Sequence, residues 1–368
     1  MTFQAFDLER WQSLWEHRVR FNLSESGVYA PTLAEFFALT DRDPAELLAV
    51  RLGYAQSDGS EPLRAALAAP YAGAGPDHVV VTVGSSEANF LACWTLLEPG
   101  DHVAVMMPNY LQVPGLARNF GCTVRTFQLH AECEWEPDPD EVAKAITPGT
   151  KLVLVTNPHN PTGKVMSPAG RKVILDRVRA VGAWLLADEV FQGAERSGQT
   201  TANLWGEYER VIVVNGLSKG WGLPGLRVGW LVVPPDLKRQ IMTRHDYTVI
   251  GAGPAQDWLM LAAVGARDRL VGRTRDILNH NYPIIASWLT AEPRLTFRAP
   301  DAGAITFAQV DHPLPTIDLA TKILEDTDVL LVPGDHFGMP GWLRIGYGGR
   351  PEDLSRGLEL VGDWLKGA

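Results

Sequence analysis

Cysteine is scarce in this chain of 368 residues, which holds three, Cys93, Cys122 and Cys133, with no CxxC spacing. An odd number without paired spacing argues against a disulfide framework, so we expect free thiols, a reducing cytoplasmic location and no metal site. Long apolar runs are also missing, since none reaches the roughly 18 residues of a membrane span. The first ten residues lack the basic-then-apolar order of a secretory signal. We therefore expect no membrane partner.

An excess of positive charge is absent as well. The chain has 33 Lys and Arg against 43 Asp and Glu, a formal net charge of −10. A general nucleic-acid binder needs a basic surface that displaces counterions, so this class is disfavoured, although a local basic pocket for a small anion remains compatible. Hydrophobic residues make up 46% and charged residues 21%, as in ordinary globular proteins. The length favours two domains.

Short apolar runs alternate with longer helix-like stretches from about residue 77. Helices are predicted at 87–97, before Pro99-Gly100, and at 168–181, where Gly182 follows. Runs that are apolar on both faces indicate strands of a sheet covered by helices, and the alternation predicts an α/β fold with a mostly parallel sheet. The predicted strands are 79–83, 103–107, 152–156, 184–187, 211–214 and 228–233.

The pattern changes after about residue 255 and predicts a smaller α+β unit. Its expected elements are helices at 254–264 and 270–290, strands at 295–297 and 305–310, and a last helix at 351–366. We predict a large domain over 30–255 and a small domain formed by 1–29 with 256–368. The first 30 or so residues show no evident partner in the sheet, so we expect them to pack on the small domain or on a neighbouring subunit.

Polar residues follow several predicted strands, at the edge where open α/β sheets bind ligands. Gly84-Ser85-Ser86 precedes a helix and offers N–H groups and hydroxyls to a phosphate, although a serine there is more often a helix cap. Asn160 lies in a stiff loop, Asn157-Pro-His-Asn-Pro-Thr-Gly163, which suits an amide that binds a ligand.

Charged groups occur at two further strand ends. Asp188 closes a buried strand, where a carboxylate is costly unless it meets a cation such as the protonated ring nitrogen of a cofactor. Lys219 and Arg227 stand eight residues apart among glycines. A desolvated lysine is a candidate amine nucleophile, and an arginine can clamp a phosphate.

These motifs, in this order, resemble the class I/II aminotransferases, which are pyridoxal 5′-phosphate (PLP) enzymes of fold type I, the aspartate-aminotransferase fold. The resemblance runs from about Gly53 to Arg344 and rests on Asn160-Pro-Thr-Gly, on Asp188-Glu-Val-Phe, and on Ser218-Lys219 followed by Pro224-Gly-Leu-Arg227-Val-Gly-Trp. It implies that PLP is bound to Lys219 as a Schiff base, that this lysine moves the Cα proton, and that Asp188 pairs with the pyridinium. The implied partners are an amino acid and a 2-oxo acid.

The resemblance assigns further roles. Asn160 would hydrogen-bond the ring hydroxyl and lie at the substrate, Tyr110 would stack on the ring, and Arg344 would grip the substrate α-carboxylate. Tyr54 would reach the phosphate of the neighbouring subunit in a homodimer. The residues that resemble the phosphate cup are Ser85, Ser86, Ser218 and Arg227.

The chain departs from the usual family pattern at three places. Phe191 stands where the family usually has tyrosine next to the cofactor ring, and Gly216 replaces a serine of the phosphate cup. The segment Leu23–Val28 replaces the usual Gly-Glu-Pro stretch, with Gly27 expected nearest the substrate carboxylate. The Phe191 variant and this segment are similar to capreomycidine-synthase-like enzymes, which eliminate and cyclise.

Two reactions are therefore predicted, with transamination first. The alternative is a PLP-dependent lyase, cyclase or oxidase of specialised metabolism, which would share every cofactor contact. A ligand sensor of the same fold, as found in transcription regulators, is disfavoured because the chain shows no basic DNA-binding module.

Overall fold

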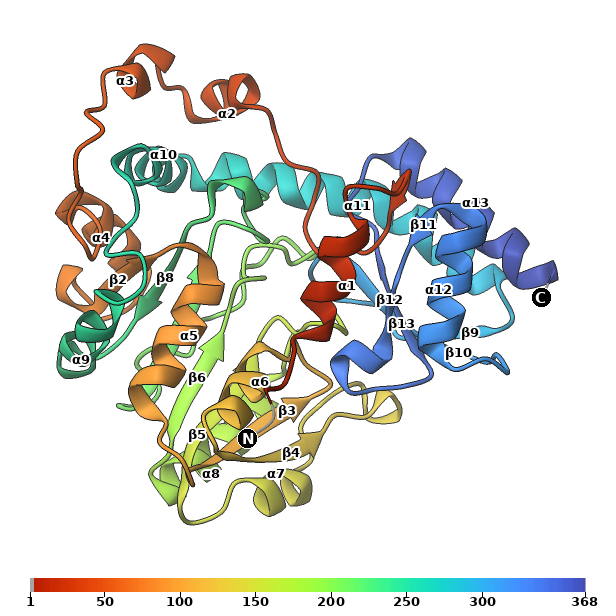
Figure 1. The fold of residues 1–368 in the computed structure, drawn as a ribbon, viewed down its shortest axis with the longest axis horizontal. Helices are drawn as coiled ribbons and strands as arrows, with labels where there is room; N and C mark the ends of the chain where they lie inside the picture. The colour runs from red at the N-terminus through yellow and green to blue at the C-terminus, as the bar shows by residue number, and fades with distance from the viewer. Residues whose placement is uncertain (1–2, 368) are drawn as a thin grey trace.

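A seven-stranded sheet forms the centre of the larger part of the molecule. The computed structural model describes residues 3–367, and its strands follow the order β2-β8-β7-β6-β5-β3-β4 (Figure 1). The strand β8 is antiparallel to its neighbours β2 and β7, and the other pairs are parallel, as predicted. The bounds are β2 Val79–Thr82, β3 His102–Met107, β4 Thr123–Gln128, β5 Thr150–Thr156, β6 Trp184–Asp188, β7 Val211–Gly216 and β8 Gly229–Val232.

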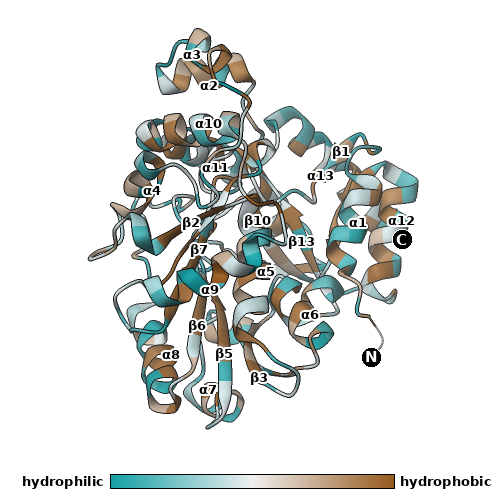
Figure 2. Ribbon diagram, turned by 60° about the vertical axis from the view of Figure 1, so that its left-hand side comes forward, coloured by the Kyte–Doolittle hydropathy of each residue, from teal (hydrophilic) through white to brown (hydrophobic). Residues whose placement is uncertain are grey.

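Helices cover both faces of this sheet because its strands are apolar on both sides. Successive residues of one strand, such as Val80 and Val81, belong to two different hydrophobic clusters. The apolar strands between helices are visible in Figure 2. One cluster includes residues of α5 (Gly84–Leu96), α6 (Gln112–Asn119) and α9 (Pro235–His245). The other includes residues of α4 (Glu61–Ala68), α7 (Pro139–Ala145), α8 (Pro168–Val181) and α10 (Pro254–Gly265).

A second, smaller group of elements lies beside the first (Figure 1). It contains a four-stranded antiparallel sheet in the order β12-β13-β10-β9 and a two-stranded pair of β1 with β11. Its strands are β1 Phe21–Asn22, β9 Leu295–Phe297, β10 Ile305–Val310, β11 Val329–Leu330, β12 Val332–Pro333 and β13 Trp342–Gly346, and its helices are α11 Arg267–Ala291, α12 Thr316–Thr327 and α13 Pro351–Gly367.

The N-terminal segment joins this smaller group. The strand β1 pairs in parallel with β11, and the indole of Trp11 in α1 (Asp7–Trp15) donates to the carbonyl of Leu331 at 2.8 Å. The helices α2 (Leu33–Thr40) and α3 (Pro44–Leu48) then lead to α4. The predicted boundaries of two domains stay a prediction. Within residues 3–367, no helix combines the length and the apolar character that a membrane span requires.

Close backbone contacts bring β7, β8 and the start of α5 together. A Cβ on Gly229 would lie 2.4 Å from the backbone nitrogen of Ser85, and a Cβ on Gly216 would lie 3.2 Å from the carbonyl oxygen of Val228. Only glycine permits such an approach. The glycine that replaces the usual serine at position 216 therefore fits the close contact between these strands.

Candidate active site

One cavity of about 470 Å³ lies at the carboxyl ends of the strands β5, β6 and β7. The cavity wall contains ten of the twelve site residues predicted from the sequence: Ser85, Ser86, Tyr110, Asn160, Asp188, Phe191, Ser218, Lys219, Arg227 and Arg344. Gly27 lies just behind the wall, since a Cβ there would be 3.7 Å from Cδ of Lys219. Tyr54 lies outside the cavity and is 97% exposed.

One end of the cavity is a cradle for an anion. The helix α5 begins at Gly84 without a side-chain cap, and a Cβ on Gly84 would lie 2.6 Å from a terminal guanidinium nitrogen of Arg227. Ser85 and Ser86 form the first turn of this helix and line the cavity with Ser218. The N–H groups of a helix start, the helix dipole and a guanidinium together favour a phosphate.

A buried carboxylate occupies the middle of the cavity. Asp188 ends β6, and its two oxygens accept hydrogen bonds from the Val190 backbone N–H at 3.2 Å and from Nδ2 of Asn89 at 3.3 Å. Burial raises the pKa of Asp188 to about 6, and these hydrogen bonds oppose the shift. Among the described residues no cation pairs with Asp188, so the site suits a cationic ring nitrogen. Asn89 lies in the middle of α5 and was not predicted as a site residue.

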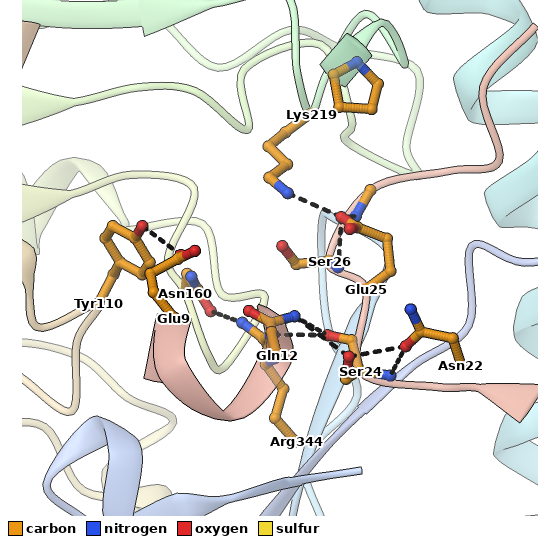
Figure 3. Close-up of polar contacts among 12 residues, drawn as sticks. Glu9, Gln12, Asn22, Ser24, Glu25, Ser26, Tyr110, Asn160, Lys219 and Arg344 are labelled. Atoms are coloured by element: carbon orange, nitrogen blue, oxygen red, sulfur yellow. Dashed lines mark hydrogen bonds and ion pairs between the residues drawn. The ribbon is translucent and has the colours of Figure 1, made fainter. Parts of the chain in front are cut away.

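The amine of Lys219 enters the cavity beside a carboxylate that the sequence analysis did not single out. Its Nζ lies 2.8 Å from Oε1 of Glu25, which comes from the loop after β1 (Figure 3). The same oxygen accepts the backbone N–H groups of Ser26 at 2.9 Å and Gly27 at 2.8 Å. The Lys219 ammonium, against the effect of burial, lowers the pKa of Glu25 to about 2.

A buried guanidinium stands at the other side of the cavity. Arg344 in β13 is 2% exposed, donates to the carbonyl of Ser24 at 2.7 Å and to Oδ1 of Asn160 at 3.1 Å, and lies over the ring of Phe337 (Figure 3). Burial lowers the pKa of Arg344 to about 10, so it stays charged at neutral pH. Its Nε is buried and has no partner among the described residues, while each terminal nitrogen has a second N–H beyond these two bonds.

The N-terminal helix α1 supplies a wall that the sequence analysis did not predict. Glu9, Gln12 and Glu16 follow the spacing of one helical face, and all three line the cavity. The hydroxyl of Tyr110 donates to Oε1 of Glu9 at 2.6 Å, which fastens the tyrosine to this helix (Figure 3). Burial, assisted by Glu9, raises the pKa of Tyr110 well above its ordinary value.

Phe191 keeps the bulk of the usual tyrosine without its hydroxyl. It is buried in a small cluster with Val190 and Ile305 and borders the cavity. A Cβ on Gly303 would lie 3.1 Å from the phenyl ring, so the ring is held closely from the side of the small sheet.

This fold and this constellation of lysine, buried carboxylate and anion cradle define a PLP-dependent enzyme of the aspartate-aminotransferase fold. The chain belongs to the family of class I and II aminotransferases, whose model matches residues 35–361. Its cofactor is pyridoxal 5′-phosphate, and the residues of the cavity fit that molecule: a cradle for its phosphate, an unpaired carboxylate for its ring nitrogen and an amine for its aldehyde.

Several relatives match nearly the whole chain. Capreomycidine synthase of Streptomyces vinaceus is 35% identical over 98% of this chain and 94% of its own length. Valine–pyruvate aminotransferase of Mycobacterium tuberculosis is 31% identical over 86% of this chain and 84% of its own. Among solved structures, a PLP-dependent aminotransferase from Streptococcus suis has a TM-score of 0.94 at 30% identity, and the PLP-dependent cyclase OrfR has 0.92 at 32%. Each covers 100% of this chain and 98% of its own.

The buried carboxylate of Asp188 leads to a prediction about the protein without PLP. Because its pKa is raised in the folded state, its contribution to stability is complete below about pH 4 and is lost as the pH rises through about 6. Relative to Asp188→Asn, the wild type should lose about 2–3 kcal/mol of unfolding free energy between about pH 4 and 7. Urea unfolding at a series of pH values measures this difference. Parallel curves for the two proteins would contradict the burial of an unpaired carboxylate.

Proposed function

We propose that this protein is a PLP-dependent enzyme that acts at the α-carbon of an amino acid with a cationic side chain. Lys219 carries the cofactor, and Asp188 holds its ring nitrogen in the protonated form. When bound, PLP supplies an electron sink for the charge that develops when a bond to Cα breaks. The phosphate is held by Ser85, Ser86, Ser218 and Arg227, and the polar contacts of this cradle support the assignment.

The protein's own groups orient the substrate and move its proton. Arg344 binds the α-carboxylate, because its guanidinium is fixed by two hydrogen bonds and keeps a second N–H on each terminal nitrogen. Asn160 accepts from Arg344, which leaves its amide N–H groups for a ligand. Lys219, once its amine is free, takes the proton from Cα. Tyr110, fastened by Glu9, lies against the face of the cofactor ring.

The acidic wall of the cavity is the observation that carries the substrate class. Glu9, Glu16 and Glu25 line one cavity, whereas its Lys and Arg residues all have proposed partners on the cofactor or on the α-carboxylate. Oε1 of Glu16 lies 3.5 Å from Nε2 of His17, a histidine that also lines the cavity. A guanidinium or ammonium group at the end of the substrate side chain would neutralise this wall, and a carboxylate there would be repelled.

The same wall disfavours a dicarboxylic acceptor, and two of the matched proteins favour elimination with ring closure over transfer of the amino group. Transamination brings a 2-oxo acid into the site, and no Lys or Arg of the cavity remains for the distal carboxylate of a dicarboxylic acceptor. Capreomycidine synthase and the cyclase OrfR, which match nearly the full chain, support this choice. In such a reaction the substrate loses its Cα proton and a β-substituent, a side-chain nitrogen then bonds to Cβ and releases a proton, and Cα is protonated again.

Transamination, the first expectation from the sequence, is the second candidate. The family model and the match to valine–pyruvate aminotransferase favour it, with a monocarboxylic acceptor such as pyruvate that avoids repulsion by the acidic wall.

A product experiment distinguishes the two reactions. The holoenzyme is incubated with arginine and β-hydroxyarginine, each with and without pyruvate or 2-oxoglutarate, and the products are identified by mass spectrometry. We expect loss of water from the β-hydroxy substrate without any 2-oxo acid. Amino-group transfer that needs pyruvate would instead establish the aminotransferase.

The same assay tests the substrate class. The ureido group of citrulline is a neutral counterpart of the guanidinium group of arginine. The variant Glu16→Gln should weaken binding of arginine about tenfold, the order expected for a charged hydrogen bond, and should leave binding of citrulline nearly unchanged. The exposed Glu325→Gln in α12 is the matched control. Equal effects on both ligands would contradict a cation site.

Lys219 should carry the cofactor covalently. Borohydride reduction of the holoenzyme followed by peptide mapping should find the pyridoxyl adduct on Lys219, because its amine is the lysine group of the cavity wall. Lys219→Ala should lose both adduct and turnover, whereas the exposed Lys151→Ala should keep them. An adduct on another lysine would overturn the assignment.

We also propose a homodimer in which Tyr54 completes the neighbouring site. Tyr54 is 97% exposed, and Leu48 and Leu52 beside it are 86% and 89% exposed, which indicates an apolar surface open to a second copy. Sedimentation should give twice the chain mass. Mixed Tyr54→Phe and Lys219→Ala subunits should regain PLP affinity, since one site of each hybrid then has both residues. A monomer, or hybrids without recovery, would contradict the proposal.

A further inference from the structure

Glu25 differs from the other carboxylates of the cavity because it touches the reacting amine. Its Oε1 receives three donors, the Lys219 Nζ at 2.8 Å and the backbone N–H groups of Ser26 at 2.9 Å and Gly27 at 2.8 Å (Figure 3). Its other oxygen makes no hydrogen bond within residues 3–367, and the half-buried side chain borders the cavity. Cofactor binding alone does not require a carboxylate at this point.

The position of this carboxylate is fixed by its own segment. The carbonyl of Leu23 accepts the N–H of Gly346 at 2.7 Å, and the carbonyl of Ser24 accepts from Arg344 at 2.7 Å. A Cβ on Gly346 would lie 2.1 Å from the carbonyl oxygen of Glu25, so the backbone of the segment lies directly against β13. Glu25 therefore keeps a constant place between the Lys219 amine and the guanidinium of Arg344.

The charge of Glu25 depends on the charge of its neighbour. The Lys219 ammonium is the main cause that lowers the pKa of Glu25 to about 2, its hydrogen bonds and Arg344 add to the effect, and burial acts in the opposite direction. When the nitrogen of Lys219 loses its positive charge, the main cause that lowers the pKa of Glu25 is gone, so the pKa of this carboxyl group rises. The two groups can thus share one proton.

We propose that Glu25 is the proton partner of Lys219, holding the free lysine as an ammonium and accepting its proton when the amine must react. In this step an N–H bond of Lys219 breaks, an O–H bond forms on Glu25, and the pair passes from ammonium and carboxylate to amine and carboxylic acid. The inference rests on the proposed role of Lys219 as the reacting amine. It gives the N-terminal segment a part in the chemistry besides substrate recognition.

The first test uses the full-length chain without PLP and therefore does not depend on turnover. Lys219 is labelled with a limiting amount of acetic anhydride at pH 7, and the labelled peptide is quantified by mass spectrometry. In Glu25→Gln, which keeps the length of the side chain, labelling should be about tenfold faster, because an opposite charge in contact favours the unreactive ammonium. Glu25→Asp should return towards the wild-type rate, and Glu16→Gln, a cavity carboxylate without contact to Lys219, should match the wild type.

The second test follows kcat of the holoenzymes against buffer concentration at pH 7. Without Glu25 the proton of the Lys219 ammonium must leave to solvent or buffer, so kcat of Glu25→Gln should fall and should rise with buffer concentration, whereas kcat of the wild type should not depend on the buffer. Added formate should restore kcat in Glu25→Ala and have no effect in Glu325→Ala, whose side chain is exposed in α12. Unchanged labelling in Glu25→Gln, or changed labelling with no loss of kcat and no rescue, would overturn the proposal. The borohydride experiment tests whether Lys219 carries the cofactor, and the labelling experiment tests the effect of Glu25 on Lys219. The two claims can therefore fail independently.

Discussion

The hydrogen bonds of Arg344 hold together the side of the cavity opposite the phosphate cradle. This guanidinium is almost fully buried and contacts the loop after β1 through Ser24 and the loop after β5 through Asn160. A buried cation is costly, and burial lowers the pKa of Arg344 to about 10. The cost is reduced by two acceptors and by the ring of Phe337 below the charge. Because three distant segments meet at one group, the positions of Asn160 and Glu25 both depend on it.

The charges of the cavity are arranged in an order that matches one extended ligand. Positive groups and a helix start stand at one end, the unpaired carboxylate of Asp188 lies in the middle, and Arg344 faces the acidic wall of α1 and Glu25. Each group is on a rigid strand end, helix start or short tethered loop. Such an arrangement binds a ligand with alternating charges without large rearrangement, which lowers the cost of ordering the site.

Much of the large sheet and of the cofactor side could be predicted because the evidence was local in sequence. The predicted helix at 168–181 coincides with α8, and the predicted strands at 295–297 and 305–310 coincide with β9 and β10. The strand β4 was missed, since it lies at the edge of the sheet and its Thr-Val-Arg-Thr-Phe-Gln sequence is not a continuous apolar run. The strand β13 was missed for a similar reason, because Arg344 interrupts the apolar run Trp342–Gly346.

The acidic wall could not be predicted by the same means. Glu25 and Lys219 are 194 positions apart, and Glu9 and Tyr110 are 101 apart, so no local spacing relates them. In the sequence, glutamates on an N-terminal helix resemble ordinary solvated charges, because only the folded structure places them beside the cavity. Asn89 was hidden for a different reason, because a polar residue inside a predicted helix gives no sign of which face it occupies. Ten predicted residues nevertheless line one cavity, since most of them follow strands whose ends lie at a common edge, whereas Arg227 precedes β8 and Arg344 lies within β13.

The placement of α1 separates two properties of the molecule along the chain. The groups proposed to hold the cofactor belong to the sheet and its adjoining helices, whereas Glu9, Gln12, Glu16 and Glu25 all precede the first helix of the large α/β layer. An exchange of this short N-terminal segment between relatives would thus change which substrate side chains the cavity accepts, while the sheet stays the same. For the same reason, a purification tag fused at the beginning of the chain adjoins a wall of the reaction chamber, and the opposite terminus, after α13, is the better place for one.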